Sequence, residues 1–305
     1  MGYNAAGKST LVKEYVSDGY FRINRDISKG SLMDQATLAE RAIDNGSFKV
    51  VLDNTYPNIH SRKDIIGVAK SKKIPIRCVH LTTSLEDAQL NACLRMIRKT
   101  GKLLGTEDFK KNTDPNLFPP AAIYHYRKEF QAPSLKEGFS AIEEVPFKRV
   151  WGPEYIHKAL ILDYDGTLRL STGKQKYPIN LSDIKMIPNR KNKIIAYQNM
   201  GYYLVGASNQ SGISKGNVTE AEVIACFEET NKQLGLNINY NFCPHKVPPI
   251  TCYCRKPAPG MGALFIEKYK LNPPDCIMIG DMTSDKTFAE RCGFQFQFAD
   301  KFFAS

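Results

Sequence analysis

Two aspartates one residue apart, Asp163 and Asp165, follow an apolar run and stand directly before Gly166 and Thr167. With this spacing both carboxylates leave the end of a strand towards one site. Asp163 can attack phosphorus and form an aspartyl-phosphate. Asp165 can protonate the leaving alcohol and then deprotonate the hydrolytic water. The pair predicts phosphoryl-transfer chemistry, in which Gly166 permits a tight turn that Thr167 anchors.

Three later segments supply the other groups that such a site needs, in the required order. The first supplies a hydroxyl and an amide, from Ser208 and Asn209. The second supplies two cations, Arg255 and Lys256, and the third two further acids, Asp281 and Asp285. The hydroxyl and the amide suit phosphate oxygens, and the cations offset the charges of the nucleophile and the phosphate. The acids suit Mg²⁺, although Asp285 by itself also fits the N-cap of a helix.

A second phosphate-binding pattern opens the sequence, since Gly2 to Thr10 fit G-x-x-x-x-G-K-[ST]. In this pattern Gly2 and Gly7 let backbone N–H groups curl around the phosphates of ATP, and Lys8 reaches the terminal oxygens. Ser9 ligates Mg²⁺, and the helix that follows presents its positive end. The pattern also needs a strand before the loop. Because the sequence begins at the loop, we expect an N-terminally truncated P-loop domain.

Acids and arginines in the same half can complete this site. Asp26 ends a strand-like run, and Asp53 ends an apolar run at the position of an acid that supports the metal's water shell. Arg95 and Arg98 are three residues apart, hence on one face of a helix. Transfer of a phosphoryl group to a hydroxyl needs a base, a metal and a cation that neutralises transition-state charge.

A short stretch of the second half has the spacing of a metal site, C-x-H-x₆-C-x-C, at Cys243, His245, Cys252 and Cys254. Three thiolates and one imidazole form a closed tetrahedral set, which is typical of structural Zn²⁺. The alternative is three ordinary reduced cysteines and a surface histidine. Because the stretch runs directly into Arg255, a bound metal would also position the catalytic cations.

Several stretches of the first half resemble the kinase module of polynucleotide kinase–phosphatases: 24–26, 53–55, 61–62, 126–133 and 137–142. The resemblance covers essentially residues 1–149. It implies that Asp26 is the general base for a 5′-hydroxyl, that Arg95 is a lid arginine, and that Arg62 contacts the substrate. It also implies that Ser9 and Asp53 share the Mg²⁺ that accompanies ATP.

The motifs of the second half resemble those of the haloacid dehalogenase phosphatases. This resemblance implies that Mg²⁺ lies between Asp163, the backbone carbonyl of Asp165 and Asp281, with Asp285 in support. It also implies catalytic roles for Ser208 and Lys256 and substrate contacts for Asn209 and Arg255. The cysteine-rich stretch and residues 209–213 look like the zinc loop of heptose bisphosphate and histidinol-phosphate phosphatases.

Alternating apolar runs and helical stretches predict two α/β domains with parallel sheets. The expected strands include 48–52, 76–81, 159–162, 202–207 and 276–279. The domains expected are a kinase-like one at 1–149 and a Rossmannoid phosphatase with a small cap at 157–305, separated by a Pro/Gly-bearing stretch. The polar, basic segment 100–120 looks like a mobile lid or insertion.

Composition restricts the class of protein. The net charge is +11, and residues 1–150 hold 24 Lys/Arg against 17 Asp/Glu, a balance that suits anionic partners such as nucleic acid. No apolar run is long enough for a membrane span, and the first residues lack the apolar core of a signal peptide. Eight cysteines without a disulfide-type framework favour a reducing compartment. We therefore expect an intracellular protein, cytoplasmic or nuclear.

Three functions remain open at this stage. The first is repair of DNA or RNA ends, by phosphorylation of 5′-hydroxyls and removal of 3′-phosphates. The second is a metabolite kinase–phosphatase acting on sugar or nucleotide phosphates. The third is a phosphatase whose kinase module has degenerated into a nucleic-acid-binding module. The sequence does not separate DNA from RNA or indicate an oligomeric state.

Overall fold

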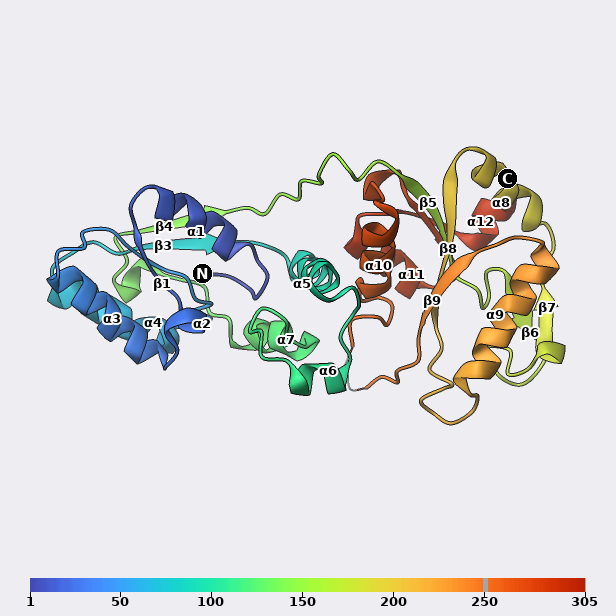
Figure 1. Ribbon diagram of the computed structural model, residues 1–305, viewed down its shortest axis with the longest axis horizontal. Helices are drawn as coiled ribbons and strands as arrows, with labels where there is room; N and C mark the ends of the chain where they lie inside the picture. The colour runs from blue at the N-terminus through green and yellow to red at the C-terminus, as the bar shows by residue number, and fades with distance from the viewer. Residues whose placement is uncertain (249–251, 305) are drawn as a thin grey trace. The chain divides into compact units, whose positions relative to one another are not determined.

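The computed structural model describes residues 1–248 and 252–304. It divides into two compact units: Met1–Ala92 with Asn112–Arg149, and Cys93–Lys111 with the chain from Val150 onward. Each unit contains parallel strands and helices, which confirms the predicted α/β class (Figure 1).

The first unit holds two separate pairs of parallel strands, β1 with β2 and β3 with β4. Its elements are α1 (Lys8–Ser17), β1 (Phe21–Ile23), α2 (Arg25–Ser28), α3 (Leu32–Asp44), β2 (Val50–Leu52), α4 (Ile59–Ser71), β3 (Arg77–Leu81), the first turns of α5 (Leu85–Thr100), α7 (Pro120–Glu129), the 3-10 helix η1 (Leu135–Glu137) and β4 (Ala141–Val145). Ile23, Ala36, Ala39 and Ile65 form a buried cluster that packs α3 and α4 against the first pair.

The glycine-rich loop starts beside β3. Met1 donates a hydrogen bond to the carbonyl of Val79, and its own carbonyl accepts one from Leu81 N over 2.9 Å. Among the described residues, only Met1 precedes the loop, and it is hydrogen-bonded to β3 without being part of a strand. A cavity of about 600 Å³ is lined by residues of β2 and β3.

The second unit is built on one five-stranded parallel sheet with the order β11-β10-β5-β8-β9. Its elements are the end of α5, α6 (Thr106–Lys111), β5 (Lys158–Leu162), β6 (Arg169–Ser171), η2 (Leu181–Asp183), β7 (Ile184–Met186), α8 (Lys191–Asn199), β8 (Tyr202–Asn209), α9 (Glu220–Leu234), β9 (Asn239–Cys243), α10 (Gly260–Tyr269), η3 (Pro273–Asp275), β10 (Ile277–Gly280), α11 (Thr283–Cys292), β11 (Gln295–Phe298) and α12 (Ala299–Ala304). The chain between β5 and β8 contains only the β6–β7 hairpin, η2 and α8 among its described elements, in agreement with the small cap expected.

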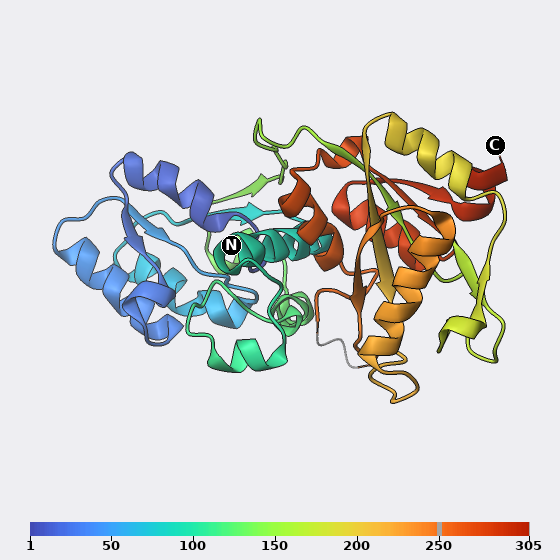
Figure 2. The same cartoon turned by 45° about the vertical axis from the view of Figure 1, so that its right-hand side comes forward.

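Helices cover both faces of this sheet. Leu160 and Leu162 of β5 pack with Ile194 of α8, Phe227 of α9 and Phe302 of α12. Figures 1 and 2 show α10 and α11 on the opposite side of the sheet. A sheet covered on both faces needs strands that are apolar throughout, as in the fully buried run 159–162. The carboxyl ends of the strands are the places where polar groups can gather.

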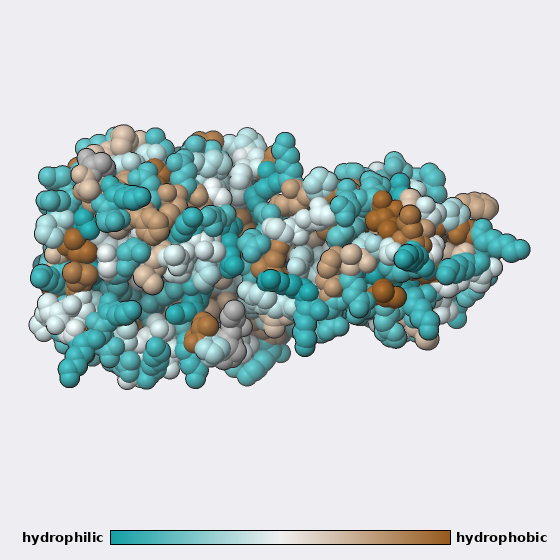
Figure 3. Space-filling view, turned by 180° about the vertical axis from the view of Figure 1, so that it is seen from behind, coloured by the Kyte–Doolittle hydropathy of each residue, from teal (hydrophilic) through white to brown (hydrophobic). Residues whose placement is uncertain are grey.

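The surface is largely hydrophilic on the face drawn in Figure 3. Within the described chain, no helix combines the length and apolar character needed to cross a membrane. The segment 100–120, predicted as a lid or insertion, contains α6 and a turn in which the Asn112 side chain donates to the carbonyls of Asp114 and Leu117, each over 2.8 Å.

Candidate active site

Three neighbouring strands of the second unit end in the predicted catalytic residues. Asp163 directly follows β5, Ser208 lies near the end of β8, and Asp281 directly follows β10. Because β10, β5 and β8 are adjacent and parallel, their carboxyl ends meet at one edge of the sheet. The structure thus brings together residues that are 45 to 118 positions apart, as the strand-end pattern predicts.

Lys256 is the cation that joins this group. Its Nζ lies 2.8 Å from Asp163 Oδ1 and 2.7 Å from Asp285 Oδ1, and it donates to the carbonyl of Ala207 over 2.7 Å. The side chains of Lys256, Asp163 and Asp285 are 2%, 9% and 1% exposed. An ammonium held in this way between two buried carboxylates fixes both of them and offsets one of their two charges.

Burial controls the ionisation of the same group. Burial raises the pKa of Asp163 to about 7, and the carboxylate of Asp285 raises it as well, while Lys256 opposes the shift. Burial by itself lowers the pKa of Lys256, but the two carboxylates outweigh it and hold the pKa above its usual value. The carboxyl group of Asp163 therefore lies in an environment that favours a further cation.

The acids leave room for such a cation. Ligand oxygens of Asp163, Asp281 and Asp285 all lie within 4.8 Å of one another. Two glycines make this approach possible, since a Cβ at Gly166 would lie 2.3 Å from Asp281 Oδ2, and one at Gly280 would lie 2.3 Å from Asp285 Oδ2. Partial burial and the neighbouring Asp285 raise the pKa of Asp281. This donor set of carboxylates fits a hard divalent ion.

Both oxygens of Asp165 are held by residues that the sequence analysis did not identify. Arg169 Nε donates to Oδ1 over 2.8 Å, and Gln210 Nε2 donates to Oδ2 over 2.6 Å. Gln210 also donates to Ser208 Oγ over 3.0 Å. The available signal for Arg169 was an arginine between two leucines, four residues after Asp165.

Two residues predicted as substrate contacts have other partners. The amide of Asn209 donates to the carbonyl of Lys256 over 3.0 Å and accepts from Lys256 N over 2.9 Å. This amide fixes the Lys256 backbone, and its predicted contact with substrate stays a prediction. Arg255 is partly exposed and donates to the carbonyl of His245 over 3.1 Å, so its predicted contact with substrate stays a prediction.

The predicted metal-binding stretch closes into a compact cluster. His245 Nδ1 lies 3.4 Å from Cys243 Sγ and 3.3 Å from Cys254 Sγ, and the sulfurs of Cys243 and Cys252 are 3.7 Å apart. Hydrogen bonds from the other two thiols lower the pKa of Cys252 and favour its thiolate. All four ligand atoms lie within 4.8 Å of one another, so this cluster can hold a metal ion.

In the first unit, the structure brings Ser9 and Asp53 together as predicted for a shared metal. Ser9 Oγ donates to Asp53 Oδ2 over 3.1 Å, and the sequence analysis missed Arg22, whose Nη2 pairs with the same oxygen at 2.5 Å. Gly7 has a φ of 95°, which turns the loop into α1 where Lys8 begins the helix. Lys8 Nζ lies over the loop and donates to the carbonyls of Gly2 and Tyr3.

The two predicted kinase residues Asp26 and Arg95 lie on helices. Asp26 is exposed in the first turn of α2, where Asn24 caps the helix by accepting from Asp26 N. Arg95 is partly buried on α5, in the stretch that groups with the second unit. Their roles as base and lid arginine stay predictions.

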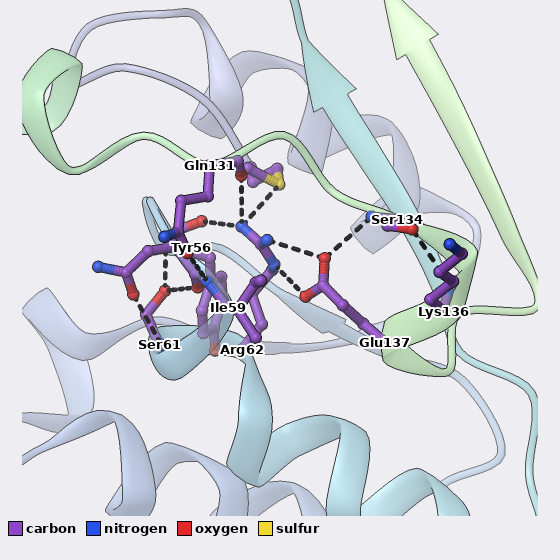
Figure 4. Close-up of polar contacts among 10 residues, drawn as sticks. Tyr56, Ile59, Ser61, Arg62, Gln131, Ser134, Lys136 and Glu137 are labelled. Atoms are coloured by element: carbon purple, nitrogen blue, oxygen red, sulfur yellow. Dashed lines mark hydrogen bonds and ion pairs between the residues drawn. The ribbon is translucent and has the colours of Figure 1, made fainter.

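Arg62, predicted to contact substrate, is buried and paired within the first unit, and its contact with substrate stays a prediction. Its side chain is 2% exposed and forms a two-pronged pair with Glu137, with Nε and Nη2 donating over 2.7 and 2.9 Å. Nη1 donates to the carbonyls of Tyr56 and Gln131 (Figure 4). The arginine therefore joins α4 to η1.

Replacing Arg62 with methionine is expected to destabilise the first unit by about 3–5 kcal/mol, because Glu137 would stay buried without its partner. Urea unfolding followed by circular dichroism measures this loss. The control Lys72→Met breaks an exposed pair with Asp44 and should change stability far less. Unchanged stability of Arg62→Met, with loss of nucleic-acid binding, would support the substrate role.

Comparison with known proteins identifies the second unit. Residues 158–305 match the family model described as polynucleotide kinase 3 phosphatase. The chain is 38% identical over 151 residues to the "Bifunctional polynucleotide phosphatase/kinase" of Schizosaccharomyces pombe, an alignment that covers 48% of this chain and only 33% of that relative. It is 34% identical over 145 residues to the "Probable D-glycero-D-manno-heptose-1,7-bisphosphate 7-phosphatase" of Thermoplasma volcanium, covering 46% of this chain and 97% of that relative.

One solved structure, "Structure of Pnkp1/Rnl/Hen1 complex", contains a chain that aligns with this one. The alignment covers 98% of this chain and 94% of the other chain, at 15% identity and a TM-score of 0.36. The family match, at residues 158–305, lies in the part of the chain that carries the strand-end aspartates. This chain therefore belongs to the phosphatase family that includes the heptose-1,7-bisphosphate 7-phosphatases, and its residues 158–305 match the polynucleotide kinase 3 phosphatase model.

Proposed function

We propose that this chain repairs nucleic-acid ends, removing 3′-phosphates in its second unit and phosphorylating 5′-hydroxyls with ATP in its first. The observation that carries the proposal is the presence of both constellations in one chain. Asp163 and Asp285 are bridged by Lys256, and Ser9 is paired with Asp53 behind a phosphate-binding loop. The similarity of the second unit to a bifunctional polynucleotide phosphatase/kinase supports the choice of substrate.

The proposed phosphatase reaction uses the two aspartates in turn. Asp163 Oδ attacks phosphorus, and the bond from phosphorus to the alcohol oxygen breaks as Asp165 gives that oxygen a proton. Asp165 then takes a proton from water, which attacks the aspartyl-phosphate and releases inorganic phosphate. Lys256 would stabilise the carboxylates throughout, and Ser208 would donate to a phosphate oxygen.

Asp163, the backbone carbonyl of Asp165, Asp281 and Asp285 would hold Mg²⁺. The crowding of the three carboxylates within 4.8 Å and the raised pKa of Asp163 fit this ion. When bound, Mg²⁺ neutralises charge between the carboxylates and the phosphate.

In the kinase reaction the backbone of Gly2 to Gly7, with Lys8, Ser9 and Thr10, would bind the phosphates of ATP. The metal of the nucleotide would be shared by Ser9 and Asp53. Asp26 would accept the proton of the 5′-hydroxyl, and Arg95 would act as the lid arginine.

A substrate comparison tests the proposal. The chain is incubated with Mg²⁺ and either an oligonucleotide with a 3′-phosphate or heptose 1,7-bisphosphate, and phosphate release is measured. Release mainly from the oligonucleotide is expected. Release from the sugar alone would favour a metabolite phosphatase, the second candidate, which the nearly full-length match to a heptose bisphosphatase supports.

The kinase half is tested separately by transfer of the γ-phosphate of ATP to a 5′-hydroxyl oligonucleotide. Transfer that Lys8→Met abolishes, with 3′-phosphate release unchanged, is expected. Oligonucleotide binding without transfer would instead indicate a degenerate kinase module.

For the cysteine–histidine cluster we propose structural Zn²⁺. Tetrahedral zinc with Zn–S near 2.3 Å and Zn–N near 2.0 Å separates its ligands by about 3.5–3.8 Å, close to the distances of 3.3, 3.4 and 3.7 Å found here. Because Arg255 donates to the carbonyl of His245, the metal would also hold the segment that leads to Lys256.

Cys252→Ser is expected to remove the zinc and to lower the unfolding temperature of the second unit, since it deletes one of four ligands. Zinc is measured by atomic emission on the purified chain. The matched control is Cys226→Ser, a buried cysteine outside the cluster, which should retain the metal. Equal zinc content in Cys252→Ser and the unaltered chain would contradict the assignment.

A further inference from the structure

Arg169 connects Asp165 to helix α9. The arginine is 1% exposed, and its Nε donates to Asp165 Oδ1 over 2.8 Å. Its Nη1 donates to the carbonyl of Cys226 and to Thr230 Oγ1, both on α9. Its guanidinium lies 4.7 Å from the centroid of the Phe227 ring, which stacks on it. Arg169 is thereby held in place by four independent contacts.

The second oxygen of Asp165 shares a hydrogen-bond donor with Ser208. Gln210 Nε2 donates to Oδ2 over 2.6 Å and to Ser208 Oγ over 3.0 Å. With Oδ1 tied to Arg169, rotation of the carboxylate is blocked and Oδ2 keeps its place beside Ser208. Proton transfer needs the oxygen of the acid within hydrogen-bond reach of the leaving group, and an error of 1 Å can cost about 100-fold in rate.

We propose that Arg169 is a positioning residue of the phosphatase, which holds Oδ1 of Asp165 so that Oδ2 exchanges protons with the reacting oxygens. This inference rests on the proposed mechanism, in which Asp165 protonates the alcohol oxygen as its bond to phosphorus breaks and later deprotonates water. If Arg169 only fastened α9 to β6, its replacement would slow the hydrolysis of all substrates equally. An arginine that positions the acid matters most for leaving groups that need a proton.

The test compares two phosphate esters in Arg169→Met, which preserves bulk beside Phe227 but donates no hydrogen bond. One is an alkyl ester that the unaltered chain hydrolyses, polynucleotide or sugar, and the other is 4-nitrophenyl phosphate, whose leaving group needs no proton. For the alkyl ester kcat/KM should fall about 30-fold, and for the aryl ester less than about 3-fold. The matched control Gln233→Met changes an exposed side chain of α9 that donates to Glu229, and it should leave both values unchanged.

Equal losses for both esters in Arg169→Met would overturn the proposal and leave a structural role. A double variant gives a second measurement. Arg169→Met added to Asp165→Asn should cost no more than Asp165→Asn alone, because both changes remove the same function, whereas multiplied losses would overturn the proposal. Arg169→Lys, which retains one donor, should recover part of the alkyl-ester rate. Since either ester class serves as substrate, failure of the polynucleotide assignment does not decide this test.

Discussion

Replacing Asp163 with asparagine is expected to lower the rate of phosphate release by at least about 10³-fold, because an amide cannot form the aspartyl-phosphate. The neighbouring Asp285 cannot replace it as nucleophile, since its Oδ1 pairs with Lys256 and its Oδ2 accepts from Met282 N. Phosphate release from a 3′-phosphorylated oligonucleotide measures the loss. ATP-dependent transfer by the first unit should be unchanged.

The matched control is Asp300→Asn, which changes an exposed carboxylate of α12 in the same unit. It should leave both activities intact. Parallel loss of phosphate release and of transfer in Asp163→Asn would contradict the proposal of two independent sites. Persistent phosphate release would instead remove Asp163 from the role of nucleophile.

The strand ends explain why the centre of the phosphatase site was predictable. Asp163, Ser208 and Asp281 each follow or end an apolar run, and the carboxyl ends of adjacent parallel strands meet by geometry alone. The metal cluster was also predictable from local pattern, because close spacing in a loop limits how far apart its ligands can lie. Its members are Cys243, His245, Cys252 and Cys254. These predictions depend on local pattern and on sheet topology.

The partners of buried polar side chains were not predictable in this way. Arg62 belongs to a motif of the kinase-like half, but its guanidinium pairs with the carboxylate of Glu137, 75 residues later. The Asn209 amide is hydrogen-bonded to the backbone of Lys256, 47 residues away. Arg169 and Gln210 both donate hydrogen bonds to Asp165. A buried charge or amide must find partners wherever the fold supplies them, so its role depends on tertiary packing that sequence spacing does not encode.

Replacing Lys256 with methionine is expected to destabilise the second unit and to abolish phosphate release together. The variant leaves the carboxylates of Asp163 and Asp285 buried and without their shared cation, a change that costs about 3–5 kcal/mol. For a unit of this size the unfolding temperature should fall by about 10 °C. Thermal unfolding and phosphate release are measured on the same samples.

Added Mg²⁺ distinguishes the charge of Lys256 from its hydrogen bond to the carbonyl of Ala207. A divalent ion that binds the three crowded carboxylates supplies the missing positive charge, so it should raise the unfolding temperature of Lys256→Met more than that of the unaltered chain. The control Lys301→Met removes an exposed lysine of α12 and should behave like the unaltered chain in both respects. If Mg²⁺ stabilised Lys256→Met and the unaltered chain equally, charge compensation would not be what Lys256 contributes, and loss of the hydrogen bond from its Nζ to the carbonyl of Ala207 would account for the destabilisation.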